Sequence, residues 1–436
     1  MRSGAAACRA RRHGIRPSTD LRKSPISRTA EKRVAVLGAG VIGVATAWYL
    51  AQTGRQVTVI DRGNDVASGT SYANAGQLSY SFTDALARPE FLRELPALLL
   101  GRDPGILFRA RPSAASLRWG SAFLRQCTTA QARNNTIAVL QIAMRSAMLM
   151  DELLEAVPLE FSFVRAGKLV LLSGPEELAA AGRSVLLKQQ YGCSVEVLTR
   201  DAALQVEPAL AEMRGDFIGA IYSRNDHVAD ARAFASGLAD RLQKGGAADF
   251  RLGETITKLT TRGDRMHSVI TDRNEYPVDA VVVCLGTGSP ELLRPLGVDP
   301  AIFPVRGYSV TLPMGEHTPS ASISDLGRRI VLSRLGDSLR IAGFADFVDF
   351  ETRRDESRID ALVAIARRTA PFAADYSAAD MQRWAGFRPM TPDGRPRVGP
   401  TRIDGLFLNT GHGMLGWTLA CATGHGVAEY VSRHRQ

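Results

Sequence analysis

The chain has 436 residues, enough for two large domains or three of ordinary size. Hydrophobic residues make up 45% and charged residues 22% of it, which excludes a mostly disordered, collagen-like or coiled-coil protein. The five cysteines lie far apart and form no CxxC pair, and the seven histidines have no paired spacing, so we predict neither a disulfide scaffold nor a metal site.

The net charge of +10 is concentrated at the N-terminus. Ten Lys/Arg and two acidic residues in residues 1–33 account for +8 and leave +2 for the other 403 residues. A nearly neutral body does not suit a protein that binds phosphate backbones, so we predict no nucleic-acid partner. Residues 1–32 are rich in Arg, Ser and Ala, which predicts a disordered basic tail. An overextended reading frame, a transit peptide and removal from the mature protein all stay open. No segment reads as a transmembrane helix.

A dinucleotide-binding pattern follows the tail. Val34–Leu37 is an apolar, β-branched run typical of a buried parallel strand, and Gly38–Gly43 (GAGVIG) comes directly after it. Val44–Thr53 is predicted to be a helix, and Gln56–Ile60 a second strand. This strand ends at Asp61, 18 residues past the last glycine and close to the spacing of such sites.

Each part of this pattern has a physical purpose. Gly38 permits the tight turn, Gly40 lets the backbone approach a pyrophosphate, and Gly43 lets helix and strand pack closely. The helix N-terminus attracts the phosphates, and Asp61 can accept from ribose hydroxyls. The alternative is a tight strand–helix turn in an unrelated α/β protein. The expected cofactor contacts are Val36, Gly38, Ala39, Gly40, Val41, Ile42, Gly43, Asp61 and Arg62.

A second segment rich in small residues runs from Ser68 to Gln77 (SGTSYANAGQ). It offers many backbone and hydroxyl donors in little space, which suits a pyrophosphate and the edge of an isoalloxazine ring. The alternative is a surface loop of turn-forming residues. The contacts expected from it are Ser71, Asn74, Ala75, Gly76 and Gln77.

Later segments favour FAD over NAD. Thr255–Leu259, Ser268–Thr271 and Tyr276–Val278 alternate like strands of a small meander, and they lead into a buried strand over Ala280–Gly286. A meander in place of a crossover helix is typical of FAD-binding Rossmann domains. Gly286 at the end of the strand is a further expected cofactor contact.

The C-terminal part repeats the strand, glycine turn and helix. Gly405–Asn409 is a predicted strand, Thr410–Gly416 a Gly-rich turn, and a helix begins at Trp417. The N-terminus of that helix can stabilise negative charge at a flavin N1–C2=O edge. Gly411, Gly413, Met414, Leu415 and Gly416 are the expected contacts. Three distant segments on one cofactor imply an extended molecule, FAD.

The rest of the chain predicts a second, mixed domain. Pro89–Val157 is predicted to be helical, with a core face of Ile137, Leu140, Met144 and Met148. Further strands are expected at Phe161–Leu172, Phe217–Tyr222, Val305–Leu312, Ile330–Leu335 and Leu339–Phe344.

The longer motifs resemble those of bacterial FAD-dependent D-amino acid dehydrogenases, within the glycine oxidase/D-amino acid oxidase superfamily. The stretches that carry the resemblance are VAVLGAGVIGVATAWYLAQTGRQVTVIDR, GTSYANAGQLS, VEPAL, GFRPMTPDGRPRVG and LFLNTGHGMLGWTLACATG, and the similarity spans about residues 33–431. Departures from the family pattern follow Gln77, over Leu78–Asp84, and occur around Tyr222–Arg232; they leave the substrate open.

The resemblance implies an α/β fold with two domains. A Rossmann-type FAD-binding domain is expected from the separated segments 33–85, 228–297 and 384–436. A second, α+β substrate domain containing an antiparallel sheet is expected from 86–227 and 298–383.

Three residues are candidates for the chemistry. Arg388, in the GFRP turn, matches the superfamily's substrate-binding Arg and can hold a carboxylate with two parallel N–H···O bonds; the alternative is a structural pair with Asp393. Tyr308 is either a substrate contact or a core residue. His412 is a flavin contact, an acid/base group or a packing residue. We name no general base.

The function implied is oxidation of a D-amino acid to a 2-oxo acid and ammonia, by hydride transfer from Cα to flavin N5. Electrons would pass to a quinone or other respiratory acceptor, in a cytoplasmic protein; a peripheral contact with the inner membrane stays open. The main alternative is oxidation of a cyclic or N-substituted amino acid, namely D-proline, cis-4-hydroxy-D-proline, sarcosine or glycine. An NAD-linked dehydrogenase and a silent flavin-binding subunit are more distant alternatives. The amino acid, its stereochemistry, the electron acceptor and the oligomeric state stay open.

Overall fold

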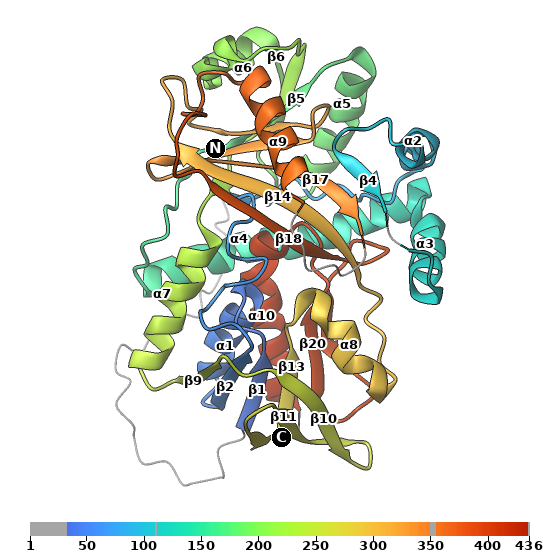
Figure 1. Ribbon diagram of the computed structural model, residues 1–436, viewed down its shortest axis with the longest axis vertical. Coiled ribbons are helices and arrows are strands. Elements are labelled where there is room, and N and C mark those ends of the chain that lie inside the picture. The colour runs from blue at the N-terminus through green and yellow to red at the C-terminus, as the bar shows by residue number, and fades with distance from the viewer. Residues whose placement is uncertain (1–32, 110, 349–354, 435–436) are drawn as a thin grey trace, which may run out of the picture.

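The computed structural model describes residues 33–109, 111–348 and 355–434, so the predicted basic tail at 1–32 lies outside the described residues. The structure is built on two large sheets, one in the lower and one in the upper half of Figure 1. This arrangement confirms the predicted α/β class with a second α+β part.

The lower sheet has six strands and is parallel except for one edge pair. Because the pairs among β20, β13, β1 and β2 are all parallel, the carboxyl ends of these strands meet at the same edge. Such an edge is where ligands bind in open α/β sheets. The strand order is β19 (Arg397–Pro400), β20 (Leu406–Thr410), β13 (Ala280–Val283), β1 (Arg33–Leu37), β2 (Gln56–Asp61) and β9 (Ala248–Leu252).

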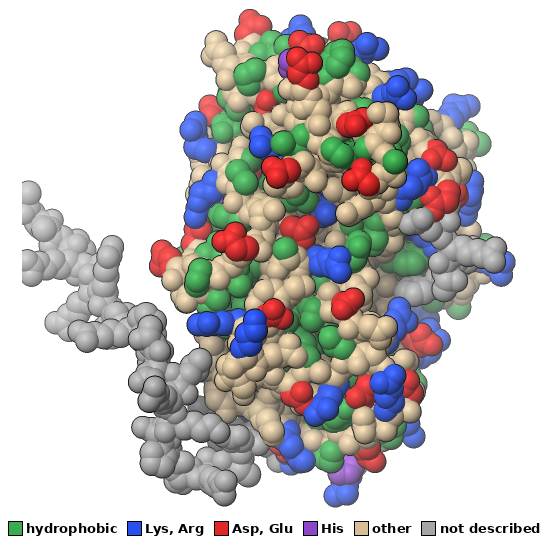
Figure 2. Space-filling view, turned by 60° about the vertical axis from the view of Figure 1, so that its left-hand side comes forward, with side chains coloured by type: hydrophobic (Ala, Val, Ile, Leu, Met, Phe, Trp, Pro, Cys, Tyr) green, Lys and Arg blue, Asp and Glu red, His purple; other side chains and the backbone are tan. Residues whose placement is uncertain are grey.

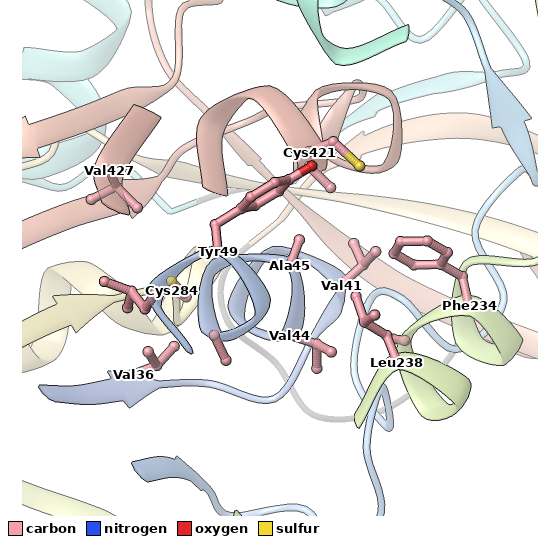
Figure 3. Close-up of a cluster of buried hydrophobic side chains, with 14 of the residues drawn as sticks. Val36, Val41, Val44, Ala45, Tyr49, Phe234, Leu238, Cys284, Cys421 and Val427 are labelled. Carbon is pink, nitrogen blue, oxygen red and sulfur yellow. The ribbon is translucent and has the colours of Figure 1, made fainter. Parts of the chain in front are cut away.

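Both faces of this sheet are covered. Val34 and Val36 of β1 face a core formed with the helices, and Ala35 and Leu37 face the meander on the other side. Figure 3 shows Tyr49 reaching from the first helix toward Cys421 of the last. The helices are α1 (Val41–Ala51), α4 (Thr129–Ala156), α7 (Ala231–Lys244) and α10 (Gly416–Arg433). The other side holds the predicted meander of β10 (Ile256–Arg262), β11 (Arg265–Thr271) and β12 (Glu275–Pro277), together with α8 (Ser289–Leu293).

The upper sheet has nine strands, mostly antiparallel, with β18 at one edge and β6 at the other. Helix α9 (Glu356–Thr369) packs on one face of this sheet. Helices α5 (Pro175–Gln189) and α6 (Arg200–Val206) lie near the edge formed by β6. The order is β18 (Gln382–Met390), β14 (Phe303–Pro313), β17 (Ser338–Phe347), β16 (Ile330–Leu335), β15 (Ser322–Asp325), β5 (Lys168–Leu172), β7 (Gly219–Ser223) and β6 (Val195–Thr199), with β4 (Ile106–Phe108) beside β17.

Smaller elements connect the two halves. The two-stranded pair of β3 (Gln77–Leu78) and β8 (His227–Val228) links the loop after β2 to the turn after β7. Helices α2 (Pro89–Leu99) and α3 (Ala114–Gln126) pack on each other through Phe91 and Phe123, whose ring centroids are 5.0 Å apart. Short 3₁₀ turns occupy Pro208–Glu212, Gly286–Gly288 and Arg294–Leu296.

Several predictions of elements need correction. The first helix begins at Val41, not Val44, so Gly43 lies in its first turn. In the expected strand Phe161–Leu172, only Lys168–Leu172 is a strand. The GFRP stretch is not a turn: it lies in β18, and the expected domain boundary at 384 also falls inside that strand. Met148 is exposed, so the core face of α4 was wrong at that residue.

No helix in the described part of the chain has both the length and the hydropathy that a membrane span requires. On the face drawn in Figure 2, Lys/Arg and Asp/Glu side chains are interspersed. That mixture agrees with the nearly neutral charge of the chain after residue 33.

Candidate active site

A cavity of about 1430 Å³ is lined by residues from both sheets. Pockets for small ligands usually measure about 300–1,000 Å³, so this one has room for an extended cofactor together with a substrate. It reaches from Asp61 and the meander strand β10 to β14, β17 and β18 of the upper sheet.

The three glycines after β1 do different things. A Cβ on Gly43 would lie 1.8 Å from the Gly38 carbonyl oxygen, so Gly43 is required for helix and strand to pack. Gly38 has a φ of +105°, and a Cβ there would lie 2.8 Å from the Cys284 carbonyl oxygen. A Cβ on Gly40 would meet only the Ser71 hydroxyl, at 3.3 Å. Gly40 is therefore not required for packing within the fold, and its missing side chain leaves space at the cavity wall.

Asp61 is held firmly at the nucleotide end of the cavity. Its carboxylate accepts hydrogen bonds from the amides of Ala39 and Gly63, both at 2.7 Å. A carboxylate has about four acceptor positions, so two remain for ribose hydroxyls. The position and chemistry of Asp61 therefore fit the predicted ribose contact.

The Ser68–Gln77 loop is fixed between the two halves. The Ser71 hydroxyl accepts from the amide of Val41 at 3.0 Å, which attaches the loop to the start of α1. Thr70 donates to the Phe387 carbonyl at 2.8 Å, and Ser309 donates to the Ala73 carbonyl at 2.6 Å. The loop is thus attached to β14 through Ser309 and to β18 through Phe387, the residue that precedes Arg388.

The Gly-rich turn before α10 borders the same cavity. The N-cap residues of α1 and α10, Gly40 and Leu415, make no side-chain cap hydrogen bond, and at α1 the Ser71 hydroxyl takes up only the amide of Val41. Uncapped helix N-termini attract anionic or electron-rich ligand groups. His412 in this turn is buried, and its Nε2 lies 3.0 Å from the Thr423 hydroxyl. Burial lowers the pKa of His412 to about 3, so the ring is neutral at neutral pH and is not an acid.

Most of the predicted cofactor contacts line the cavity. Val36, Ala39, Gly43 and Gly411 are not among its lining residues. With Asp61, two uncapped helix N-termini and the small-residue loop, the site fits FAD. The predicted contacts along the wall are Gly38, Gly40, Val41, Ile42, Asp61, Arg62, Ser71, Asn74, Ala75, Gly76, Gln77, Gly286, Gly413, Met414, Leu415 and Gly416.

Arg388 projects a guanidinium into the other end of the cavity. Its Nη1 donates to the Phe344 carbonyl at 2.6 Å, and within the described residues it has no ion-pair partner within 4.0 Å. Asp393, the alternative partner, pairs instead with Arg397 at 3.0 Å. Burial lowers the pKa of Arg388 to about 10, against the raising effect of Asp346, so the group stays cationic. A half-buried cation that lines a cavity in this way suits a carboxylate ligand.

A β-bulge orients Arg388. The pairing of β14 with β17 shifts between Arg306 and Tyr308, so that two residues of β17, starting at Phe344, lie opposite Gly307. Phe344 has a φ of +62°, unusual for a bulky residue, and this conformation places its carbonyl against Arg388. Strain at one residue is thereby coupled to the position of the guanidinium.

Tyr308 occupies a different environment. Its ring belongs to the hydrophobic cluster that β14 forms with α9, although the residue also borders the cavity. Its hydroxyl donates to Asp346 at 2.8 Å, and Asp346 also accepts two hydrogen bonds from Arg358. Burial is the main cause that raises the pKa of Tyr308. The geometry favours the core alternative over a substrate contact.

Among the polar residues of the cavity that the sequence analysis does not single out is Lys168. Lys168 opens β5, in the run KLVLL whose five residues are all buried, and it lines the cavity. A lysine at the start of an apolar strand is a pattern in the sequence that indicates a buried charge. Its partners, Gln77 and Ser79, are 91 and 89 residues away and could not be read from local pattern.

Comparisons with known proteins agree with this geometry. The family model described as "FAD dependent oxidoreductase" matches residues 33–430. The chain is 40% identical over 410 residues to D-amino acid dehydrogenase 2 of Ralstonia nicotianae, covering 92% of this chain and 96% of that protein. It is 38% identical over 410 residues to D-amino acid dehydrogenase of Dechloromonas aromatica, covering 92% and 97%.

Solved structures share the fold at low sequence identity. Glycine oxidase from Geobacillus kaustophilus has a TM-score of 0.72 and 22% identity, with 93% of this chain and 96% of that chain covered. L-proline dehydrogenase from P. horikoshii has a TM-score of 0.70 and 17% identity, with 92% of each chain covered. At these identities the likeness concerns the fold alone.

Proposed function

The chain belongs to the family of FAD-dependent oxidoreductases, and on that premise we propose that it oxidises D-amino acids to 2-oxo acids and ammonia. The family match and the relatives at 38–40% identity confirm the predicted FAD cofactor and the resemblance on which it rested. The observation that carries the substrate proposal is Arg388: a half-buried guanidinium without a carboxylate partner among the described residues, facing the FAD cavity.

The residues of the chain would act by binding and orientation. Arg388 would hold the substrate carboxylate through two parallel charge-assisted hydrogen bonds. FAD, when bound, supplies the acceptor for the hydride from Cα. The amine loses one proton to solvent, and water then hydrolyses the imino acid to 2-oxo acid and ammonia. Fixing the carboxylate and Cα in this way is worth about 7–11 kcal/mol of the barrier in favourable cases.

We propose a quinone as electron acceptor, reached through a peripheral membrane contact. The support is the set of exposed leucines on α2, at its C-cap and on α3, here called the α2–α3 face. Its exposed leucines are Leu92, Leu99, Leu100, Leu117 and Leu124. Residues 88–126 carry seven Arg against three acidic residues. Exposed leucines in a segment rich in arginine suit the surface of an anionic bilayer.

Anaerobic bleaching of the bound flavin tests the substrate class. The purified protein is mixed without oxygen with D- and L-amino acids, D-proline, cis-4-hydroxy-D-proline, sarcosine and glycine, and the yellow absorbance is followed. Bleaching by common D-amino acids, with formation of 2-oxo acid, is expected. Bleaching restricted to the cyclic or N-substituted compounds would replace the proposal by the alternative, and bleaching restricted to L-amino acids would refute the stereochemistry.

A further inference from the structure

Lys168 is a buried lysine without an ion-pair partner. The residue is 2% exposed, and no carboxylate in the described part of the chain lies within 4.0 Å of its Nζ. The ammonium donates to Ser79 Oγ at 3.0 Å and to Gln77 Oε1 at 3.2 Å. It also lies 4.2 Å from the centre of the Phe82 ring. Burying a cation that contacts only neutral groups costs free energy, because the charge loses its hydration. Such a residue is therefore a candidate for a functional role.

The two hydrogen-bond partners place Lys168 beside the predicted flavin contacts. Gln77 is the last residue of the Ser68–Gln77 loop. The amide of Ser79 donates to Thr418 Oγ1 at 2.9 Å, and Thr418 lies in the first turn of α10. All of these residues line the cavity. Lys168 therefore sits where the loop and the N-terminus of α10 come together.

The charges around Lys168 are few and can be named. Asp226, in the turn between β7 and β8, is fully buried; its Oδ1 accepts from the Ser81 amide at 2.9 Å, and its Oδ2 has no partner among the described residues. Lys188 of α5 is also buried and forms an ion pair with Asp84 at 2.5 Å. Burial lowers the pKa of Lys168 to about 8, Asp226 and Asp84 raise it, and Lys188 lowers it further.

We propose that Lys168 sets the electron affinity of the bound flavin through the charge of its ammonium group. Reduction transfers a hydride, two electrons and one proton, from the donor carbon to the ring, which then carries one extra negative charge. The ammonium of Lys168 stabilises that charge from a fixed position without giving up its own proton. The proposal rests on FAD binding but not on the identity of the substrate.

The test is the midpoint potential of the flavin in Lys168→Met, measured by dye titration without any amino acid. Loss of the cation disfavours reduction, and we expect the equilibrium constant against a fixed reference dye to fall about tenfold, or about 30 mV for a two-electron couple. Lys168→Arg keeps the charge and should stay within about threefold of the wild type. The double variant Asp84→Asn, Lys188→Met, which removes the neighbouring cation together with the carboxylate that neutralises it, is the matched control and should shift the potential less.

The pH profile gives a second readout that needs no variant to fold. The midpoint potential of the wild type should be higher than that of Lys168→Met at neutral pH. This difference should shrink as pH rises above about 8, because Lys168 then becomes neutral. Equal potentials in the wild type and Lys168→Met, with FAD fully bound in both, would overturn the proposal. The proposal would also be overturned if, between pH 7 and pH 10, the potential of the wild-type protein showed no inflection other than the one that free FAD shows. Neither outcome depends on which amine is oxidised, so a failure here is distinct from a failure of the substrate proposal.

Discussion

Gly307 and Arg388 are fitted to each other across neighbouring strands. A Cβ on Gly307 would lie 2.5 Å from Arg388 Nη2 and 2.6 Å from its Cζ. The absence of a side chain on β14 therefore creates the space in which the guanidinium of β18 lies. Because the obstructing atoms belong to the end of a flexible side chain, a larger residue at 307 would move the guanidinium before it disturbed the sheet.

Gly307→Ala should leave the fold intact and impair catalysis. A displacement of about 1 Å at a positioning group can cost about 10²-fold, so we expect kcat/KM for the amino acid to fall by about that factor while FAD content stays normal. Steady-state kinetics and the flavin absorbance of the purified variant check this. Gly120→Ala, where nothing lies within 4 Å of the new Cβ, is the matched control. Wild-type kinetics in Gly307→Ala would separate Arg388 from substrate binding.

Arg388→Lys should lose activity even though it keeps the positive charge. A lysine cannot form the two parallel hydrogen bonds of a guanidinium, nor is it placed to reach the Phe344 carbonyl with the same geometry. Loss of one or two charge-assisted hydrogen bonds predicts a fall in kcat/KM of about 10–10⁴-fold. FAD should remain bound in stoichiometric amount, as shown by its absorbance. A variant with unchanged kcat/KM would eliminate the carboxylate role.

Local pattern was sufficient for the nucleotide end of the site. The strand at Val34–Leu37, the glycines after it and Asp61 were placed to within a few residues, because a buried parallel strand and a glycine turn are signals of consecutive residues. The error at the start of α1 was small: the helix begins inside the glycine motif, at Val41.

The substrate end depends on contacts that local pattern does not contain. Arg388 was found by resemblance, but its strand was missed because Gly386 and Pro389 are turn-forming residues; β18 tolerates the proline because it is an edge strand. The positive φ of Phe344 occurs at the bulge where the register of β14 against β17 shifts, a tertiary feature. The hydrogen-bond partners of Lys168, Gln77 and Ser79, are distant in the sequence and come close to it only in the tertiary structure.

His412 should make the protein less stable in acid. Its pKa is about 3 in the folded protein, against about 6.5 in an unfolded chain, because burial disfavours the charged ring. Between these values only the unfolded state binds the proton, so the free energy of unfolding is unaffected above pH 6.5 and falls as pH drops, by up to about 1.4 kcal/mol per pH unit.

His412→Gln removes this titration and keeps a polar partner for Thr423. From pH 7 to pH 4.5 the wild type should therefore lose about 2–3 kcal/mol more unfolding free energy than the variant. Denaturant titrations of both proteins at the two pH values give this difference. Parallel losses in the two proteins would show that the buried ring does not control acid stability.

The α2–α3 face should bind anionic membranes. Leu99 and Leu100 are 63% and 68% exposed, and burying a leucine is worth about 1.5–3 kcal/mol, so the double variant Leu99→Ser, Leu100→Ser should lose at least about tenfold in vesicle affinity. Sedimentation with vesicles containing phosphatidylglycerol measures it, and added salt should weaken binding because arginines contribute. Leu186→Ser, equally exposed at 62% but on α5, is the matched control and should bind like the wild type. If the double variant and the control bind equally, or the wild type does not sediment with vesicles, this face is not a membrane contact and the route to a quinone must lie elsewhere.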